Sequence, residues 1–389
     1  MFRGNAGGRF VALGMAVILV SSCGSSGATA ARKAADADTA LDAAIKQIVT
    51  AEGGPPGIAV VVQRGSRVEF HAAGIAVVGG GTAPQINDHM RLASVAKAFS
   101  GAAALALVAD RVLSLNDTVS KWRPDLPRAW AEVTLAQLLG HTSGIPDFSQ
   151  TEAFQAALGA SLLSPPPPVK LLSFVADQPL EFTPGVRYAY SNTDNIVVAL
   201  IIEAATHRPY EAVLEQRVLQ PLGLPDTSLP TDATMPSPFM HGYQAQASGP
   251  PEDVSELFAA GWTFASGGVV STPGDANRFI RGYVKGATTN KATRTAQFHF
   301  IQGGNSEPPG PGTNAAGLAI FQYQTGCGTV YGHTGNTPGY TQFVAATSDG
   351  SRSVSVAVNA QINANGGQNQ FPALRNIFGL AVCAALAGT

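Results

Sequence analysis

A single charged side chain, Lys97, interrupts an otherwise apolar stretch of the chain. The segment RLASVAKAFSGAAALALVAD at residues 91–110 is rich in Ala and Leu and contains no Pro. It therefore predicts a helix that is apolar on nearly every side, and such a helix lies inside a protein. An unpaired ammonium in that place costs several kcal/mol or changes its pKa strongly. Any fold of this chain must give Lys97 buried partners or a chemical role.

Ser94, three residues before Lys97, is a candidate partner. Residues i and i+3 of a helix lie on one face, with Cβ atoms about 5–6 Å apart. A serine hydroxyl needs a neighbouring base to become a nucleophile, and burial disfavours the charged form of a lysine, which makes it a proton acceptor. Backbone N–H groups at a helix start also favour negative charge. The spacing predicts a nucleophilic Ser94; a structural lysine whose head extends to the surface is the alternative.

A second candidate element is FTPGVRYAYSNTDN at residues 182–195. If Tyr190 reaches the Ser94–Lys97 pair, its phenol can ionise beside the ammonium and act as a general base. Asn192 carries both a donor and an acceptor, so it is predicted to hold a substrate amide. Taken alone, this Tyr-x-Asn pattern is also typical of an ordinary exposed loop.

A third candidate element is YGHTGNTPGY at residues 331–340, on a predicted late strand. His333 and Thr334 offer an imidazole and a hydroxyl, and Gly335 lets a substrate approach the backbone closely. The N–H of Asn336 is predicted to pair with that of Ser94 as an oxyanion hole. A structural histidine on the strand is the alternative.

Together these elements resemble the penicillin-recognising serine hydrolases, which include class C β-lactamases, D,D-carboxypeptidases and related esterases. Ser-x-x-Lys, Tyr-x-Asn and then His-Thr-Gly, in place of Lys-Thr-Gly, follow that family's order. Three surrounding segments also resemble the family, and the resemblance runs from about Leu41 to the end of the chain. The segments are VTLAQLLGHTSGIPDF (133–148), FTPGVRYAYSN (182–192) and ASGGVVSTPGDANRF (265–279).

The resemblance implies an acyl-enzyme mechanism without a cofactor. Ser94 attacks a carbonyl, Lys97 and Tyr190 remove and relay its proton, and water hydrolyses the acyl-enzyme. The N–H groups of Ser94 and Asn336 form the oxyanion hole.

The same resemblance assigns substrate binding to four further residues. Asn192 and Thr334 orient the substrate, Gly335 lies beside it, and His333 takes the place of a lysine that would meet a substrate carboxylate. Because imidazole is mostly neutral near pH 7, carboxylate binding is predicted to weaken as pH rises through the pKa of His333.

The predicted function is hydrolysis of D-Ala-D-Ala-like peptide, ester or β-lactam carbonyls in the cell envelope, with carboxypeptidase or esterase activity favoured. The substrate is a small molecule or of peptidoglycan type. A non-catalytic binding or structural protein on the same fold is the alternative. An α/β-hydrolase is excluded because the chain has no Gly-x-Ser-x-Gly elbow. His141 and Asp147 are interpreted as loop-structuring residues, not members of a catalytic triad.

Strand and helix signals predict an α+β chain. Residues 57–74 read as a β-hairpin, helical periods dominate from 91 to about 229, and strand signals return late, from GGVVST onward, before a C-terminal helix. The expected architecture is an antiparallel sheet from both chain ends, covered by terminal helices, with a helical insertion. The expected α/β part is about 39–80 and 255–389, and the helical part about 81–254; the resemblance implies the β-lactamase/transpeptidase-like fold.

The N-terminus predicts export. Residues 1–22 read as a signal peptide, with Arg3 and Arg9 before an apolar run at 10–20 that is too short to span a bilayer. The VSSC sequence predicts lipidation at Cys23 on the outer face of the cell membrane, with a secreted protein as the alternative. Residues 23–38 are expected to be a flexible tether with nothing to bury.

Cysteine usage and charge indicate the redox compartment and the classes of partner that this chain can have. With Cys23 lipidated, Cys327 and Cys383 form an even pair that predicts a disulfide in an oxidising compartment; two buried free thiols are the alternative. A net charge of −2 and 13% charged residues argue against a nucleic-acid partner. The 7 histidines include no His-x-x-x-His pair, so no metal site is predicted.

Overall fold

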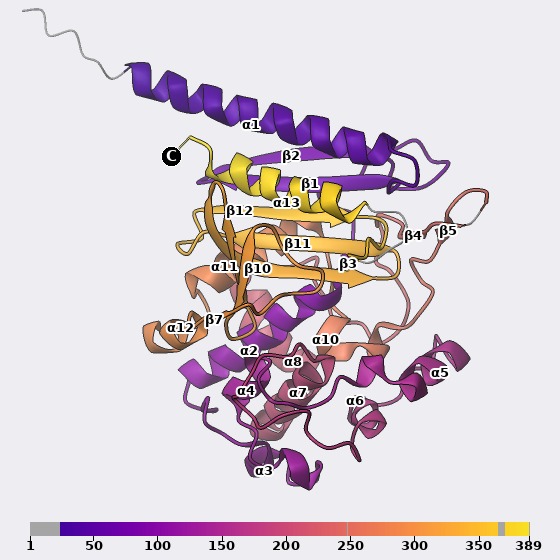
Figure 1. Cartoon of the computed structure of the whole chain (residues 1–389), viewed down its shortest axis with the longest axis vertical. Coiled ribbons are helices and arrows are strands. Elements are labelled where there is room, and N and C mark those ends of the chain that lie inside the picture. Colours follow the sequence, from indigo (N-terminus) through magenta and orange to yellow (C-terminus); the bar gives the residue numbers. More distant parts are fainter. Residues whose placement is uncertain (1–23, 247, 365–369, 389) are drawn as a thin grey trace, which may run out of the picture.

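An eight-stranded antiparallel sheet forms the centre of the molecule (Figure 1). The computed structural model describes residues 24–246, 248–364 and 370–388, with side chains from residue 29 onward. The strand order β2-β1-β12-β11-β10-β9-β8-β7 brings the two ends of the chain together, as predicted. The strands are β1 Gly57–Arg64, β2 Arg67–Gly74, β7 Ile301–Gln302, β8 Thr313–Ala316, β9 Phe321–Thr325, β10 Gly328–Thr337, β11 Tyr340–Ala346 and β12 Arg352–Val358.

The central strands are buried because both faces of the sheet are covered. β1 reads GIAVVVQR and is buried over almost its whole length, as expected for a continuous apolar strand. It pairs with β12 in the register Val60↔Val356 and with β2 through a tight turn at Gly65, whose φ of 61° suits a glycine. The predicted hairpin is therefore confirmed.

Helices lie on both sides of this sheet and form a separate helical part below it (Figure 1). The helices are α1 Gly24–Thr50, α2 Ala96–Ala109, α3 Val119–Trp122, α4 Leu135–Leu139, α5 Glu152–Ala160, α6 Pro168–Leu171, α7 Asn192–Thr206, α8 Tyr210–Leu214, α9 Gln220–Leu222, α10 Phe264–Gly267, α11 Pro273–Lys285, α12 Lys291–Gln297 and α13 Phe371–Leu386. Among the described residues, no helix is both long and apolar enough to span a membrane.

Two hydrophobic clusters hold these layers together. The first joins α1 and α13 to one face of the sheet, and it contains Leu41, Ile45 and Ile48 from the amphipathic face of α1. The second is larger and packs α2, α7 and α11 with the rest of the helical part. The sequence expectation of an α+β fold with terminal helices on the sheet is confirmed.

The GGVVST segment does not join the large sheet. It forms β6 (Val270–Ser271), which pairs with β3 (Met90–Arg91) in a separate two-stranded sheet directly before the nucleophile segment. A further two-stranded sheet joins β4 (Tyr243–Gln244) and β5 (Glu252–Asp253). The prediction of a late meander was therefore wrong for its first strand. That strand pairs with β3, which lies far away in the sequence, and local sequence patterns do not show such a pairing.

The prediction of a flexible tether at residues 23–38 was also wrong. Residues 24–38 belong to α1, which continues without a break into the predicted amphipathic helix. The segment is rich in Ala and contains no Pro, so little opposes helix formation. It also gains polar partners that the sequence pattern does not show: Asp38 pairs with Arg64 of β1. Cys23 and the predicted signal peptide lie outside the described residues.

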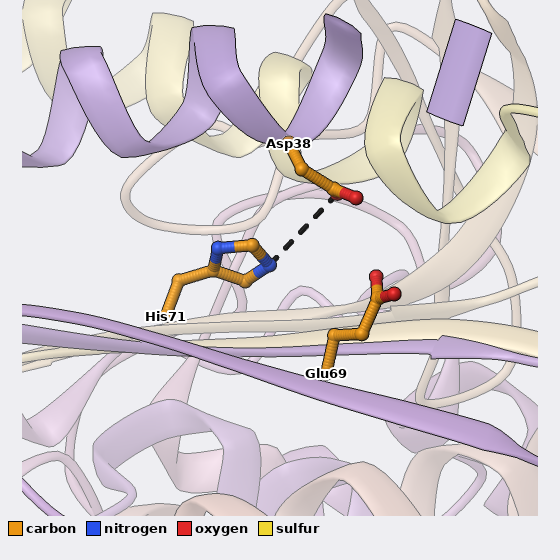
Figure 2. A group of neighbouring side chains, drawn as sticks. All are labelled: Asp38, Glu69 and His71. Carbon is orange, nitrogen blue, oxygen red and sulfur yellow. Dashed lines mark ion pairs between the residues drawn. The ribbon is translucent and has the colours of Figure 1, made fainter. Parts of the chain in front are cut away.

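A charged cluster docks α1 on the sheet (Figure 2). Asp38 points down from α1 toward Glu69 and His71, which rise from β2. The guanidinium of Arg64 donates to both Asp38 and Glu69, and its Nε donates to the carbonyl of Ala384 in α13. Arg64 thus ties two helices to the sheet. We call Asp38, Arg64, Glu69 and His71 the docking cluster.

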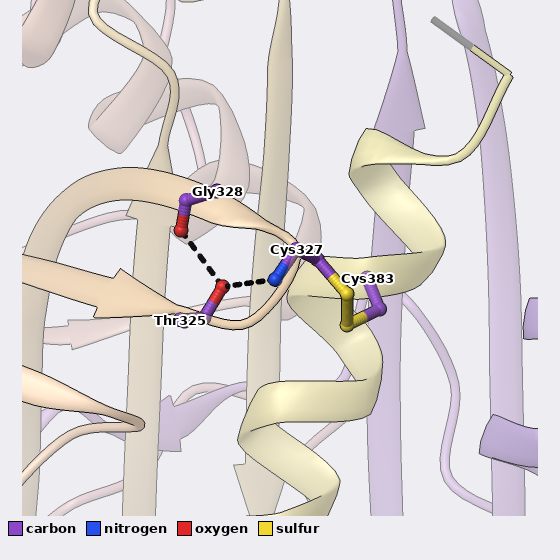
Figure 3. The surroundings of a disulfide bond; sticks show 4 residues. All are labelled: Thr325, Cys327, Gly328 and Cys383. Atoms are coloured by element: carbon purple, nitrogen blue, oxygen red, sulfur yellow. Dashed lines mark hydrogen bonds between the residues drawn. A yellow bond between two sulfur atoms is a disulfide. The ribbon is translucent and has the colours of Figure 1, made fainter.

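The predicted disulfide between Cys327 and Cys383 is formed (Figure 3). Cys327 lies in the turn between β9 and β10, where its N–H donates to Thr325, and Cys383 lies in α13. Their Cα atoms are 5.2 Å apart. The bond attaches the C-terminal helix to the strand pair that leads into the third motif.

Candidate active site

Ser94 lies at the entry to the buried helix that the sequence predicts. A short 3₁₀ segment, Ala93–Val95, leads directly into α2, and Ala93 has a positive φ of 49°. A non-glycine residue in that region is uncommon and typical of functional sites. α2 is buried over most of its length, Lys97 included, so the expectation of an all-round buried helix is confirmed.

Lys97 makes three polar contacts in this apolar setting. Its Nζ lies 3.1 Å from Ser94 Oγ, 2.6 Å from Asn192 Oδ1 and 2.7 Å from the carbonyl oxygen of Ser266. None of these partners carries a negative charge. Burial therefore lowers the pKa of Lys97 to about 7, against the opposing effect of more distant acids such as Asp147. The amine is neutral in a large fraction of molecules near neutral pH.

Tyr190 reaches the same pair. Its ring lies 4.9 Å from Lys97 Nζ, and the Ser94 hydroxyl stabilises the ionised phenol. Burial outweighs this effect and raises the pKa of Tyr190 well above its usual value. The expectation that the phenol ionises beside the ammonium was therefore wrong for the resting site. Tyr190 stands there as a protonated group that can donate.

Asn192 starts α7 and connects Lys97 to a loop. Its Oδ1 accepts from Lys97, while its Nδ2 donates to Asp147 Oδ2 and to Ser149 Oγ, each at 2.9 Å. Both ends of the amide therefore have protein partners. These contacts make Asn192 a positioning residue for Lys97. Because Asn192 also lines the cavity in front of Ser94, its predicted contact with a substrate amide stays a prediction.

The third motif packs against the nucleophile segment. A Cβ at Gly335 would lie 2.3 Å from the carbonyl oxygen of Leu92 and 3.2 Å from the backbone nitrogen of Ser94. Gly335 therefore lets β10 pack closely against the Ser94 segment. The sequence interpretation had expected it to make room for a substrate instead. The approach puts Asn336 on the same cavity as Ser94. The oxyanion hole formed by their N–H groups stays a prediction.

Thr334 and His333 do not face a substrate as the sequence interpretation expected. The Thr334 hydroxyl is buried and donates to the carbonyl of Pro308 at 2.5 Å, so it holds the loop before β8. His333 is fully buried, stacks edge-on against Phe321, and donates from Nδ1 to the carbonyl of Thr334. Burial lowers the pKa of His333 to about 3. It is therefore neutral at physiological pH, and its predicted role as the charge partner of a carboxylate was wrong.

A cavity of about 710 Å³ opens in front of Ser94. This volume lies in the usual range for a small-molecule site. Tyr190, Asn192 and Asn336 line the cavity together with the loop at residues 305–309. The first two motifs and the end of the third thus meet at one cavity, from segments far apart in the sequence.

Comparison with known proteins places these motifs in one family. The Beta-lactamase family profile matches residues 41–377, which include all three motifs. The chain belongs to this family.

Two relatives of this chain are named as hydrolases. The chain is 28% identical over 235 residues to the D-alanyl-D-alanine-carboxypeptidase/endopeptidase AmpH of Escherichia coli, covering 59% of this chain and 58% of that protein. It is 31% identical over 201 residues to esterase EstB of Burkholderia gladioli, covering 48% and 50%. The chain thus spans less than two thirds of the length of these relatives.

The fold of one solved structure matches nearly the whole of this chain. A D-stereospecific amidohydrolase from Streptomyces sp. has a TM-score of 0.76 and 27% sequence identity, and covers 90% of this chain and 99% of its own. The chain therefore has the β-lactamase/transpeptidase-like fold, in a serine hydrolase family with carboxypeptidase, esterase and amidohydrolase relatives.

Two residues of the family-like segment at 133–148 are structural, as interpreted. A hydrogen bond of 2.9 Å joins Nδ1 of the buried His141 to the carboxyl group of Asp194. Ser143 Oγ donates to the same carboxyl group at 2.5 Å. Asp147 accepts from the N–H of Ser149 and holds Asn192. These contacts fix the loop on α7, and neither residue contacts Ser94.

Sequence reasoning missed the loop at residues 305–309, above all Glu307. Glu307 lines the cavity and is exposed to it. The available signal was a Pro- and Gly-rich stretch, NSEPPGPG, which is typical of a surface loop that carries function. That signal gives no reason to bring the loop to Ser94, because the contact depends on tertiary structure.

One group of described residues has the spacing of metal ligands. Single ligand atoms of Asp38, Glu69 and His71 lie within 4.8 Å of one another. Arg64 already places its guanidinium between the two carboxylates. We therefore assign this group to the docking of α1.

Proposed function

We propose that this protein is a serine hydrolase that cleaves ester and amide bonds through an acyl-enzyme on Ser94. The observation that carries the proposal is the contact between the Ser94 hydroxyl and Lys97, an amine whose burial brings its pKa to about 7. Family relatives include an esterase and an amidohydrolase, which supports both bond types.

The geometry around Lys97 suits a neutral amine that acts as a base. A neutral amine has two hydrogens and one lone pair. Its two shorter contacts, at 2.6 and 2.7 Å, are to carbonyl-type oxygens of Asn192 and Ser266 that accept only. These contacts use the two hydrogens and leave the lone pair for the proton of Ser94 at 3.1 Å. The proton of Ser94 therefore passes to Lys97 as its oxygen attacks the substrate carbonyl.

The second half of the reaction returns that proton. When the tetrahedral intermediate collapses, the bond to the leaving group breaks and the leaving group takes a proton from the protonated Tyr190, which Lys97 restores. Water then attacks the acyl-enzyme and gives a proton to Lys97. The bond between the acyl carbon and Ser94 Oγ breaks, Oγ takes that proton back from Lys97, and the acid leaves. In this sequence Tyr190 acts as a relay with its phenol protonated at rest.

Among the predicted activities, the cavity favours esters and amides over D,D-carboxypeptidase substrates. A carboxypeptidase substrate ends in a carboxylate, which would be stabilised by a cation at the third motif. His333 is buried and neutral, so it offers no such charge.

Active-site labelling tests the proposal. The purified full-length protein is incubated with a fluorophosphonate probe, and its intact mass is measured alongside p-nitrophenyl acetate turnover. One label per chain and Ser94-dependent turnover are expected, with both lost in Ser94→Ala. Ser173→Ala, an exposed serine outside the cavity, serves as the matched control and keeps both. A label that persists in Ser94→Ala, or neither label nor turnover in the unmodified protein, contradicts the proposal and favours a non-catalytic protein.

The pH dependence of labelling tests the role of Lys97. Because the reactive form is the neutral amine, the labelling rate should rise with pH through about 7 and level off above it. The measurement is the rate of mass change between pH 5.5 and 9. A rate that is independent of pH over that range contradicts a lysine base.

We also propose that the protein is exported and anchored by lipid at Cys23. The basic and apolar N-terminal segments and the VSSC sequence support this, and the Cys327–Cys383 disulfide suits an oxidising compartment. Detergent phase partitioning of the protein from cells tests it. We expect the protein in the detergent phase and Cys23→Ser in the aqueous phase; equal partitioning of the two would contradict lipidation.

A further inference from the structure

Among the described residues that line the cavity in front of Ser94, one carries a carboxylate, Glu307. The other described lining residues are uncharged apart from the titratable phenol of Tyr190. The charge presented to a substrate is therefore negative.

The cations close to the cavity are not available to a substrate. All three contacts of Lys97 are taken by Ser94, Asn192 and Ser266. Arg91 is buried and donates to the carbonyls of Ser255 and Ala233. Within the described part of the chain, a substrate carboxylate would thus enter a cavity with an unpaired acid and without a free cation.

Glu307 differs from the neighbouring acid, Asp147. The carboxylate of Asp147 already accepts from the Ser149 N–H and from Asn192 Nδ2. Glu307 has no hydrogen bond or ion pair to any residue in the described part of the chain, and it is exposed to the cavity. Burial and the charge of Asp147 raise the pKa of Glu307, and the charge of Lys97 opposes them without forming an ion pair, so the ionised form lacks full compensation. A cation that enters the cavity would supply it.

The loop that carries Glu307 is held on both sides. Tyr188 Oη donates to the carbonyl of Asn305 at 2.5 Å, and Thr334 Oγ1 donates to that of Pro308 at 2.5 Å. The first contact ties the loop to the segment of the second motif and the second ties it to the third motif. Glu307 is therefore fixed between two parts of the catalytic machinery, and its charge acts on both Lys97 and Tyr190.

We propose that Glu307 is a specificity-determining residue that binds an ammonium group of the substrate beside the scissile carbonyl. The substrate class is then amides or esters of amino compounds with a free amino group, such as amino-acid amides or the N-terminal residue of a peptide. N-acylated and carboxylate-terminated compounds are disfavoured. This inference rests on the proposed acyl-enzyme function of Ser94.

Competition against ester turnover tests the inference. Hydrolysis of p-nitrophenyl acetate by the full-length protein is inhibited with phenylalaninamide, N-acetylphenylalaninamide or N-acetylphenylalanine, each as both enantiomers. The three compounds are cationic, neutral and anionic, and the two acetylated ones are nearly equal in size. At low salt we expect the cationic amide, in the better-bound enantiomer, to have an inhibition constant about tenfold lower than its acetylated form, and the anion to bind most weakly. The ratio should shrink as ionic strength rises.

The variant Glu307→Gln should reduce this ratio to near one. Glu132→Gln removes an equivalent charge from an exposed residue that does not line the cavity, and should leave the ratio unchanged. A ratio near one in the unmodified protein, tighter binding of the anion, or a preference that survives in Glu307→Gln would overturn the inference. Loss of Ser94-dependent turnover in the unmodified protein is a separate result, which removes the proposed function itself.

Discussion

Two clusters of charged residues in this molecule differ in whether their charges form ion pairs. In the docking cluster, between α1 and β2, Arg64 donates to both Asp38 and Glu69. In the active site, between β10 and the helical part, Lys97 is bound by three uncharged oxygens, and Glu307 has no partner among the described residues. The first cluster pairs its charges directly within the protein, whereas in the second the two opposite charges form no ion pair.

The difference shows how a buried or half-buried charge can be assigned to structure or to chemistry. Compensated ions hold elements together, and they have little reason to change protonation. An ion without a counter-charge has a shifted pKa, and such groups gather at functional sites. In this chain the lowered pKa of Lys97 and the unpaired Glu307 belong to one cavity.

Lys97→Ala should have the largest effect on activity. Removal of the general base is expected to lower the rate of Ser94 acylation by about a thousandfold, while the protein stays folded. The measurement is the labelling rate, with circular dichroism as the check on folding. Lys170→Ala, an exposed lysine, is the matched control and should label normally. Near-normal labelling of a folded Lys97→Ala protein would contradict the role given to Lys97.

Arg64→Met should affect stability and not ester turnover. It leaves Asp38 and Glu69 without their shared cation, so the free energy of unfolding should fall by about 1–3 kcal/mol, measured by urea denaturation. Arg67 pairs with the same Glu69 but is largely exposed, so Arg67→Met should cost less than about 1 kcal/mol. Turnover per folded molecule should stay the same. Equal losses of stability in the two variants would remove the distinction between them.

His333 should show no titration at all between pH 5 and 8. Its pKa is lowered to about 3 by burial, so its imidazole resonance should keep one chemical shift over that range, with His333→Asn used to identify it by NMR. The unfolded chain takes up a proton near the ordinary pKa of about 6.5, so this residue lowers the free energy of unfolding as pH falls below that value. A titration centred between pH 5 and 8 would restore His333 as a charge partner in the cavity.

Much of the fold follows from patterns along the chain. The all-apolar run around Lys97 predicted a buried helix, and the two β-branched runs around the turn at Gly65 predicted a hairpin. The pairing of Cys327 with Cys383 was predicted from their number and setting and is formed. Each of these signals depends on a residue and its near neighbours, or on a count that leaves few choices.

The α1 helix shows where such patterns fail. Residues 24–38 lack an apolar face strong enough to predict a packed helix, and Arg64, the ion-pair partner of Asp38, comes from a hairpin more than twenty residues later. The same limit applied to Asn192, whose type correctly suggested an amide with two functions. Only the fold shows that Lys97 and Asp147 use both of them.

By itself, the sequence determined which groups could do chemistry, because the spacing of Ser94 and Lys97 and the order of the three motifs are local facts. Only the tertiary structure decided the charges that a substrate meets. It buries His333, gives Lys97 uncharged hydrogen-bond partners and places Glu307 at the cavity. The physical reason is that pKa and pairing depend on desolvation and on neighbours in space, which residues far apart in the chain supply together.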